Sequence, residues 1–322
     1  MQSDLASYTV MKRDAPTMYF IGVTTGQSSI MRLFPRWAEA LGLVGAQLVG
    51  VDLPLHAAPE RYRQAIAQMK YDPLSLGGLV TTHKIDLLQA TEEQFDSLDR
   101  YARLCHEVSC IFKRDGALVG QAKDPINSGL ALGHILGPHY WEHSGGDVLC
   151  LGAGGSGTAI TVNLLSQADA RDRPQRLIVT SRNQPALDTL RAIVAQLPPT
   201  MEVEYLLNED PCKNDQLLAS LPSGSVVINA TGMGKDRPGS PITDDGRFPM
   251  TGVAWELNYR GALDFLHQAK AQEQQRQLSV HDGWHYFLIS WADHIAEVFN
   301  RKIAPTEFNQ LAQLAELIRD PG

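Results

Sequence analysis

Short apolar segments of strand length alternate with segments of helical periodicity along most of the chain. In the first part, strands are predicted at 18–23, 46–52 and 77–82, with helices at 30–41 and 59–69 between them. Strands and helices in alternation are typical of βαβ units, in which each helix connects two parallel strands. The pattern therefore predicts a parallel sheet covered by helices on both faces.

The pattern changes after Lys84. Two further helices are predicted near 86–88 and 93–104, and a hairpin follows them. The strands of the hairpin, 109–112 and 117–120, flank Arg114-Asp115-Gly116, a sequence typical of a tight turn.

A second alternating series begins with a helix near 127–135. Its strands are predicted at 148–151, 176–180, 202–207, 225–230 and 253–257, and its helices at 158–168, 186–197 and 215–221. Residues 284–319 are predicted to form two helices broken near Pro305, and we expect this pair to pack back on the first domain. The chain is therefore predicted to fold into two α/β domains.

A glycine-rich turn in the second series carries the strongest local signal. The buried strand 148–151 leads into Gly152-Ala153-Gly154-Gly155-Ser156-Gly157, and a helical segment follows directly. In such a G-x-G-x-x-G turn, the first glycine allows the tight turn, the second lets the backbone approach a pyrophosphate, and the third permits close helix contact. The helix N-terminus adds amide donors for the phosphates. These residues predict a Rossmann-type dinucleotide-binding domain, which we assign to residues 126–283.

The end of the next strand bears on the choice of cofactor. An acidic residue there would bind the ribose 2′-hydroxyl of NAD, but the strand 176–180 is followed by Ser181-Arg182-Asn183. An arginine can pair with a 2′-phosphate, so NADP is favoured, with NAD as the alternative. A solvated charge at the strand end is the other interpretation of Arg182.

Composition narrows the class of protein without naming its function. The 322 residues are 43% hydrophobic and 20% charged, which is ordinary globular composition. The net charge of −8 and the lack of a dense Lys/Arg run argue against nucleic-acid and membrane partners. Four scattered cysteines and an N-terminus without a signal-peptide pattern favour a cytoplasmic protein. We expect a monomer or homodimer that binds a small molecule, with no metal.

Two charged residues follow predicted strands of the first domain. Lys84 comes after 77–82, and Asp124 comes after 117–120. Open α/β sheets place their ligands at the carboxyl ends of strands, so both residues are site candidates as well as candidates for ordinary surface charges.

The chain resembles the shikimate dehydrogenase family in the order and spacing of its motifs. The family's G-x-P-I-x-H-S-x-S-P segment is similar to Gly22 through Met31, and its N-V-T-x-P-x-K segment is similar to Gly78 through Lys84. Its N-T-D segment resembles Ala122-Lys123-Asp124, and its G-A-G-G-[AS]-x-x-A turn matches Gly152 through Ala159. Its N-R-T and N-A-T segments are similar to Ser181-Arg182-Asn183 and Asn229-Ala230-Thr231. The resemblance covers residues 18–300.

The resemblance implies roles for individual residues. Lys84 and Asp124 would be the catalytic pair. The cofactor would be bound by Gly152, Gly154, Gly155, Ser156, Gly157, Ser181, Arg182, Asn183, Ala230 and Thr231. Substrate contacts would come from Ser28, Ser109, Lys123 and Ser290. The resemblance also implies that a substrate-binding domain, residues 1–125 plus 284–322, and an NADP-binding domain, residues 126–283, flank a cleft that holds the catalytic pair.

Several positions depart from the family pattern. Ile30 stands where the family has a second serine for the substrate carboxylate, Ser109 replaces an asparagine, and Ser290 replaces a glutamine. Asn258 aligns with a tyrosine, unless the alignment shifts by one residue onto Tyr259. Lys123, absent from the family pattern, could recruit an anionic group or be an exposed lysine. The catalytic pair is therefore kept while the substrate contacts are changed.

The resemblance implies an NADP-dependent enzyme that transfers hydride between NADP(H) and a ring hydroxyl or ketone of shikimate or a related small polyol acid. Quinate or an amino-sugar-type polyol is the alternative substrate. A non-catalytic protein that binds NADP and a metabolite as a sensor is the alternative function, because the changed substrate contacts would suit it. Retention of both Lys84 and Asp124 favours the enzyme.

Overall fold

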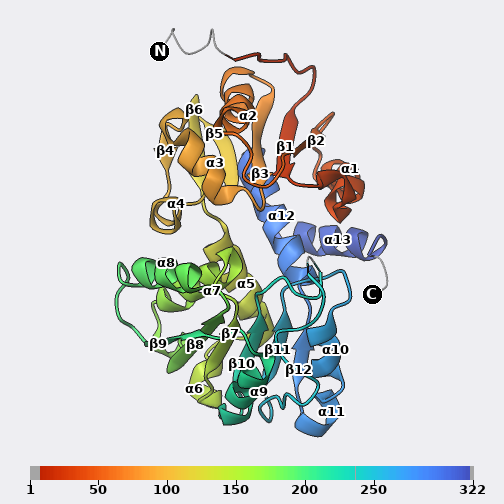
Figure 1. The fold of residues 1–322 in the computed structure, drawn as a ribbon. Coiled ribbons are helices and arrows are strands. Elements are labelled where there is room, and N and C mark those ends of the chain that lie inside the picture. The colour runs from red at the N-terminus through yellow and green to blue at the C-terminus, as the bar shows by residue number, and fades with distance from the viewer. Residues whose placement is uncertain (1–7, 236, 320–322) are drawn as a thin grey trace. The chain divides into compact units, whose positions relative to one another are not determined.

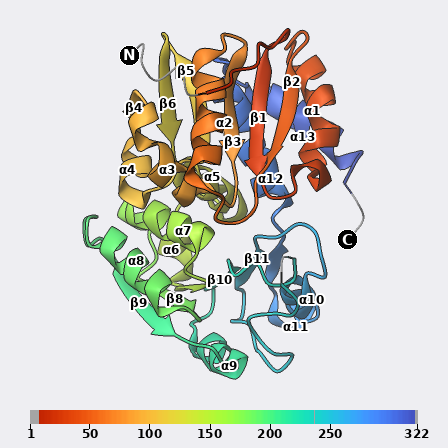
Figure 2. The same cartoon turned by 45° about the horizontal axis from the view of Figure 1, so that its top comes forward.

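The computed structural model describes residues 8–235 and 237–319 (Figure 1). The chain divides into two compact units (Figure 2). Of the described residues, unit 1 contains 8–123 and 290–319, and unit 2 contains those within Asp124–Ile289. The chain thus enters unit 2 between Lys123 and Asp124 and returns within helix α12 (Trp284–Val298).

Unit 1 contains a six-stranded mixed sheet. Its strand order is β2 (Gln47–Asp52), β1 (Thr17–Gly22), β3 (Ser75–Val80), β5 (Cys110–Arg114), β6 (Ala117–Gln121) and β4 (Ser97–Leu98). Strands β2, β1 and β3 are parallel, but β5 is antiparallel to both β3 and β6. The prediction of a parallel sheet is therefore wrong for the β5–β6 part of unit 1, because the predicted hairpin adds two strands that pair antiparallel. Asp115 and Gly116, both with positive φ, turn the chain directly back on itself.

The helices of unit 1 cover both faces of this sheet. They are α1 (Ser29–Ala40), α2 (Pro59–Tyr71), α3 (Lys84–Thr91), α4 (Arg100–Cys105), the later part of α12, and α13 (Pro305–Glu316). Tyr19 and Ile21 of β1 pack with apolar side chains of α2 and α3. The Phe20 side chain lies on the opposite face of the sheet. Its ring packs edge to face against that of Trp291 in α12, with the ring centroids 4.9 Å apart. Thus the expected return of the C-terminal helix pair to the first domain is confirmed.

One predicted helix of unit 1 is wrong. The segment 93–104 contains the short strand β4, and α4 begins only at Arg100. Asp99 caps that helix by accepting a hydrogen bond from the Ala102 amide at 2.7 Å. The preceding residues are extended because Asp96 exchanges hydrogen bonds with Leu118 of β6.

Unit 2 contains a six-stranded parallel sheet of Rossmann type. Its strand order is β9 (Glu202–Leu207), β8 (Arg176–Ser181), β7 (Val148–Leu151), β10 (Val226–Asn229), β11 (Val253–Glu256) and β12 (Ser279–His281). The strand order reverses between β7 and β10, which is where such sheets bind ligands. Strand β12 was not predicted, since its three residues are too few to show a pattern.

Helices cover both faces of the second sheet as well. They are α5 (Asp124–Leu136), α6 (Tyr140–Ser144), α7 (Gly155–Leu165), α8 (Gln184–Val194), α9 (Pro211–Ser220), α10 (Asp264–Lys270) and α11 (Glu273–Arg276). Val148 and Cys150 of β7 pack with residues of α5, α7 and α8, whereas Leu149 and Leu151 pack with residues of α9 and α10. None of the helices in the described part of the chain has the length and apolar character that a membrane span requires.

Candidate functional site

The glycine-rich turn connects β7 to α7 and has the geometry that its sequence predicts. Gly152 has a φ of +117°, and a Cβ added there would lie 2.6 Å from the Ala230 carbonyl oxygen. A Cβ added to Gly157 would lie 2.0 Å from the Gly152 carbonyl oxygen. By contrast, a Cβ on the exposed Gly154 would meet no atom within 4 Å. The first and third glycines are therefore needed by the fold, and the second leaves open space at the helix N-terminus.

The neighbouring strand β8 ends at Ser181, beside this turn. The Ser181 hydroxyl accepts a hydrogen bond from the Asn183 amide at 3.1 Å, and Asn183 caps α8 by accepting from the Ala186 amide at 3.2 Å. Arg182 lies between them and is exposed. Two local hydrogen bonds thus fix the backbone on either side of Arg182, while Arg182 itself is exposed.

A cavity of about 270 Å³ lies at this edge of the unit 2 sheet. Seven of the ten predicted cofactor residues line it: Gly152, Gly154, Ser181, Arg182, Asn183, Ala230 and Thr231. Gly155, Ser156 and Gly157 form the first turn of α7 and do not line the cavity. Residues distant from one another in the sequence are thus brought to one ligand-sized space, as the motif predicts.

Sequence reasoning missed several residues of the cavity. Arg237 adds a second cation to its lining, and Asn208 and Asn214 line it as well. The two asparagines are buried and joined by a hydrogen bond of 2.6 Å. These residues come from segments without a recognisable motif, so only the fold could bring them together.

A buried carboxylate supports the turn after β10. Glu256, at the end of β11, is 0% exposed, and its Oε2 accepts a hydrogen bond from the Asn229 side chain at 2.6 Å. Its Oε1 accepts from the backbone and side-chain amides of Asn258, at 2.8 and 2.7 Å. Asn229 in turn accepts from the Thr231 amide and hydroxyl, at 3.1 and 2.6 Å. Glu256 therefore holds the turn that brings Thr231 to the cavity.

Burial raises the pKa of Glu256 to about 7, although the hydrogen bonds from Asn258 and Asn229 lower it. Asn258, one of the two candidates for the position at which the family has a tyrosine, is part of this network. Tyr259, the other candidate, packs against Trp284 and Phe287, with ring centroids 5.3 and 4.7 Å away.

In unit 1, Lys84 is the first residue of α3, directly after the turn that ends β3. Thr82 in this turn has a φ of +61°, which is costly for a β-branched residue. His83 is 1% exposed; its Nε2 donates to the Leu53 carbonyl oxygen at 3.1 Å, and its Nδ1 accepts from the Tyr62 hydroxyl at 3.0 Å. The buried imidazole thus anchors the strained turn that presents Lys84.

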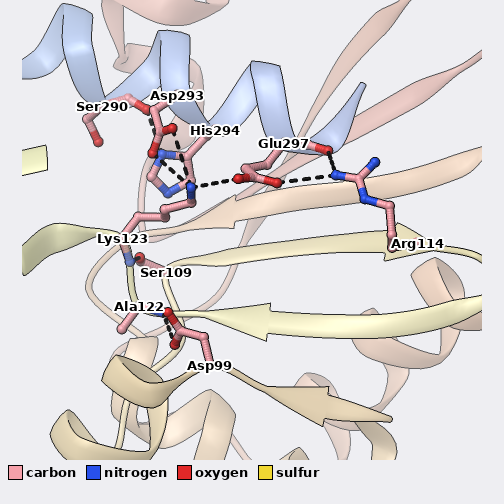
Figure 3. A network of polar contacts seen from close by, with 9 residues as sticks. All are labelled: Asp99, Ser109, Arg114, Ala122, Lys123, Ser290, Asp293, His294 and Glu297. Atoms are coloured by element: carbon pink, nitrogen blue, oxygen red, sulfur yellow. Dashed lines mark hydrogen bonds and ion pairs between the residues drawn. The ribbon is translucent and has the colours of Figure 1, made fainter. Parts of the chain in front are cut away.

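The residues around Lys123 form a second polar network in unit 1 (Figure 3). The buried Ser109 hydroxyl accepts a hydrogen bond from the Lys123 amide at 2.8 Å. The Ser109 carbonyl accepts from the Val80 amide at 2.8 Å, and the Lys84 carbonyl accepts from the Val108 amide at 3.2 Å. The segment 108–109 therefore connects the backbones near the two predicted catalytic residues.

The Lys123 side chain is buried, so the interpretation of Lys123 as an exposed lysine is wrong. Its ammonium lies 2.8 Å from a Glu297 oxygen and 3.2 Å from an Asp293 oxygen, and only 7% of the side chain is accessible. The next residue, Asp124, is 6% exposed and begins α5, where the helix dipole favours a carboxylate. Lys84 belongs to unit 1 and Asp124 to unit 2, and their action as a pair stays a prediction.

The remaining predicted substrate residues lie in unit 1. Ser28 precedes α1 and is buried, and Ile30 in the first turn of that helix is 0% exposed. The carboxyl ends of β1 and β3 are neighbours, because the Thr81 amide donates to the Ile21 carbonyl at 2.9 Å. Ser290 is partly buried on α12, and its carbonyl accepts from His294 Nδ1 at 2.6 Å. The segments that carry Ser28 and Lys84 thus follow adjacent strands.

Comparison with known proteins finds curated relatives of low sequence identity. No family model matches the sequence. A curated shikimate dehydrogenase (NADP(+)) from Streptococcus thermophilus is 25% identical over 183 residues, which cover 55% of this chain and 58% of that protein. The matched part is thus less than two thirds of that relative's length. Three further curated relatives, 24–25% identical, bear the same name. The chain is thus similar, at about 25% identity, to curated proteins named shikimate dehydrogenase.

Solved structures share the fold of this chain. Shikimate 5-dehydrogenase from Listeria monocytogenes, solved with shikimate and NAD, aligns with a TM-score of 0.71 at 16% identity, over 95% of this chain and 98% of that one. The 5-ketofructose reductase of a Gluconobacter strain aligns with a TM-score of 0.66 at 19% identity, over 95% and 99% of the two chains. The two-domain α/β fold predicted from the sequence is therefore confirmed.

Proposed function

We propose that this protein is an NADP-dependent oxidoreductase that interconverts a ring hydroxyl and a ketone of shikimate or a related small polyol acid. The observation that carries the proposal is the cavity in unit 2, where the glycine-rich turn, Arg182 and Thr231 meet at the strand-order reversal. Curated relatives named shikimate dehydrogenase (NADP(+)) support the same cofactor.

The residues around the cavity fit a dinucleotide. The open space beside Gly154 admits a phosphate to the N-terminus of α7, where backbone amides and the helix dipole favour an anion. Arg182 would hold the 2′-phosphate, because a guanidinium forms charge-assisted hydrogen bonds with phosphate oxygens. No acidic residue follows β8 directly to accept from a 2′-hydroxyl. When bound, NADP(H) supplies the hydride chemistry.

Lys84 and Asp124 would supply the proton chemistry. Lys84 would remove the proton of the substrate hydroxyl during oxidation and return it to the carbonyl oxygen during reduction. Asp124 would orient the substrate hydroxyl and Lys84 and share the proton transfer. The strained turn at Thr82 supports this role, because backbone strain beside a chemically competent side chain is common at functional sites.

Substrate recognition would fall to Ser28, Ser109 and Ser290, and Lys123 is the fourth predicted contact although the family pattern has no lysine there. A neutral polyol or keto sugar is a second candidate substrate, and the position of Ile30 favours it. This apolar side chain is fully buried where the family has a serine for the substrate carboxylate. The fold is compatible with both substrates, since a 5-ketofructose reductase shares it. Quinate and amino-sugar-type polyols are the other candidate substrates, and the substrate panel described next includes them.

A substrate panel tests the proposal. The full-length protein is assayed for NADP reduction, followed by absorbance, with shikimate, quinate, an amino polyol and neutral polyols, and each assay is repeated with NAD. We expect turnover with NADP on at least one of these alcohols, and a loss of about 100- to 10,000-fold in Lys84→Met. Tight NADP binding without turnover on any of them would instead support the sensor. Turnover that persists in Lys84→Met would remove the catalytic assignment.

A further inference from the structure

Lys123 is a buried cation held by two carboxylates from a distant part of the chain. Asp293 and Glu297 lie one turn apart on α12, so both face the same side of the helix. Their oxygens lie 3.2 and 2.8 Å from the Lys123 ammonium (Figure 3). Removing the Lys123 ammonium from water is costly unless anions compensate it, and the two carboxylates do so while their side chains stay 28% exposed. The contact therefore fixes the Lys123 side chain in one geometry.

The charges around Lys123 are balanced. Arg114 donates to the other carboxylate oxygen of Glu297 at 3.2 Å and to its carbonyl oxygen, also at 3.2 Å. Two cations thus face two anions within this network. Burial alone would lower the pKa of Lys123, but Asp293 and Glu297 outweigh it and raise the pKa above its usual range. The ammonium therefore stays charged and paired with Asp293 and Glu297, which neutralise the positive charge that a substrate anion would need.

The backbone before Asp124 is held as firmly as the side chain. The Lys123 amide donates to the Ser109 hydroxyl at 2.8 Å, and the Ala122 amide donates to Asp99 at 3.2 Å. Asp99 is itself fixed, because it caps α4. The residue that directly precedes Asp124 is therefore tied through its amide to Ser109, the residue before β5, and through its side chain to α12.

We propose that Lys123 is a positioning residue: its ion pairs with Asp293 and Glu297 fix the backbone from which Asp124 presents its carboxylate. The inference rests on the proposed function for the role of Asp124. It differs from a substrate contact by Lys123 in what it predicts, because a positioning residue changes kcat, whereas a lost substrate contact changes KM.

The kinetic test uses the full-length protein, NADP and the alcohol of the panel that is turned over fastest. We expect Lys123→Met to lower kcat by about 10- to 100-fold, since small displacements of a catalytic group have effects of this size. KM for the alcohol should change less than about twofold, and Lys123→Arg should recover most of the lost kcat. In an Asp124→Asn background, Lys123→Met should lower kcat by less than about twofold, because its effect passes through Asp124.

Arg114→Met is the matched control. It removes a cation from the same Glu297 but leaves the Lys123 contacts and the backbone before Asp124 in place. Its kcat should stay within about twofold of the wild type. An equal loss of kcat in Arg114→Met would overturn the inference, as would an unchanged kcat or a raised KM with unchanged kcat in Lys123→Met. Asp293→Asn, a milder change that keeps the Glu297 contact, should lower kcat in the same direction as Lys123→Met.

Hydrogen exchange followed by mass spectrometry separates this inference from the proposed function. A peptide spanning 122–128 should exchange faster in Lys123→Met than in the wild type or Arg114→Met, whether or not any alcohol is turned over. Unchanged exchange in this peptide would overturn the inference even if the enzyme is active. Faster exchange, together with a wild type inactive on the whole panel, would support the tether and refute only the proposed function.

Discussion

Glu256 offers a sharp test of the structure, because its ionisation is opposed by its surroundings. Its carboxylate is fully buried at the end of β11 and accepts three hydrogen bonds, one from Asn229 and two from Asn258. Burial raises its pKa from 4.5 to about 7 in the folded protein. In the unfolded chain the same carboxyl titrates near 4.5, as an exposed glutamate does.

The sign of the effect on stability follows from these two values. Between pH 4.5 and pH 7 the folded protein retains a proton that the unfolded chain has released. The free energy of unfolding contributed by Glu256 therefore falls as the pH rises through this range and is constant above it. Each unit of pKa corresponds to about 1.4 kcal/mol, so the total change is about 3 kcal/mol between pH 4 and pH 8.

Glu256→Gln isolates this contribution. The glutamine cannot ionise, and its Oε1 can still accept from Asn258, while its Nε2 meets the Asn229 amide and loses one hydrogen bond. That loss is independent of pH. The free energy of unfolding of each protein is measured by urea unfolding, followed by tryptophan fluorescence. We expect the value for the wild type minus that for Glu256→Gln to fall by about 3 kcal/mol from pH 4 to pH 8. Parallel pH profiles for the two proteins would refute the reasoning.

Further predictions concern the predicted cofactor residues. Arg182→Met should weaken NADP binding about 10- to 100-fold, because a charge-assisted hydrogen bond contributes about 1.5–3 kcal/mol, and should leave NAD binding unchanged in isothermal titration calorimetry. Equal weakening of both cofactors would contradict the 2′-phosphate assignment. Gly157→Ala should lower the free energy of unfolding by about 1–3 kcal/mol, since its Cβ meets the Gly152 carbonyl. Gly154→Ala, with open space around the added Cβ, should keep thermal stability but weaken NADP binding; equal destabilisation by both changes would be evidence against the turn geometry.

The alternation of strands and helices predicted much of the fold, because residues with one buried face keep a regular period. The turn at Gly152 was predicted together with its strand and helix, since positive φ and close backbone contact leave few alternatives to glycine. The errors fell where local pattern is weak. Strand β4 has two residues and is extended only through its pairing with β6, so a helical period was assigned to a segment that is not a continuous helix.

The candidate site divides in the same way. Arg182 and the glycines belong to a local motif and could be predicted from sequence. Arg237 could not, because only the tertiary fold brings its loop to the cavity. Lys123 is the clearest case, because its partners Asp293 and Glu297 lie about 170 residues further along the chain. The local sequence, a lysine between a strand and a helix, predicts an exposed side chain, and only the packing of α12 buries it.

Deuterium transfer tests the central claim most directly. The full-length protein is incubated with NADPH carrying deuterium at C4 on either face and with the ketone of the alcohol that the panel identifies. We predict that one of the two labelled cofactors delivers a single deuterium to the carbinol carbon of the product, detected by mass spectrometry. Transfer should fall by about 100-fold or more in Lys84→Met. Product without deuterium from either cofactor, or undiminished transfer in Lys84→Met, would contradict the account.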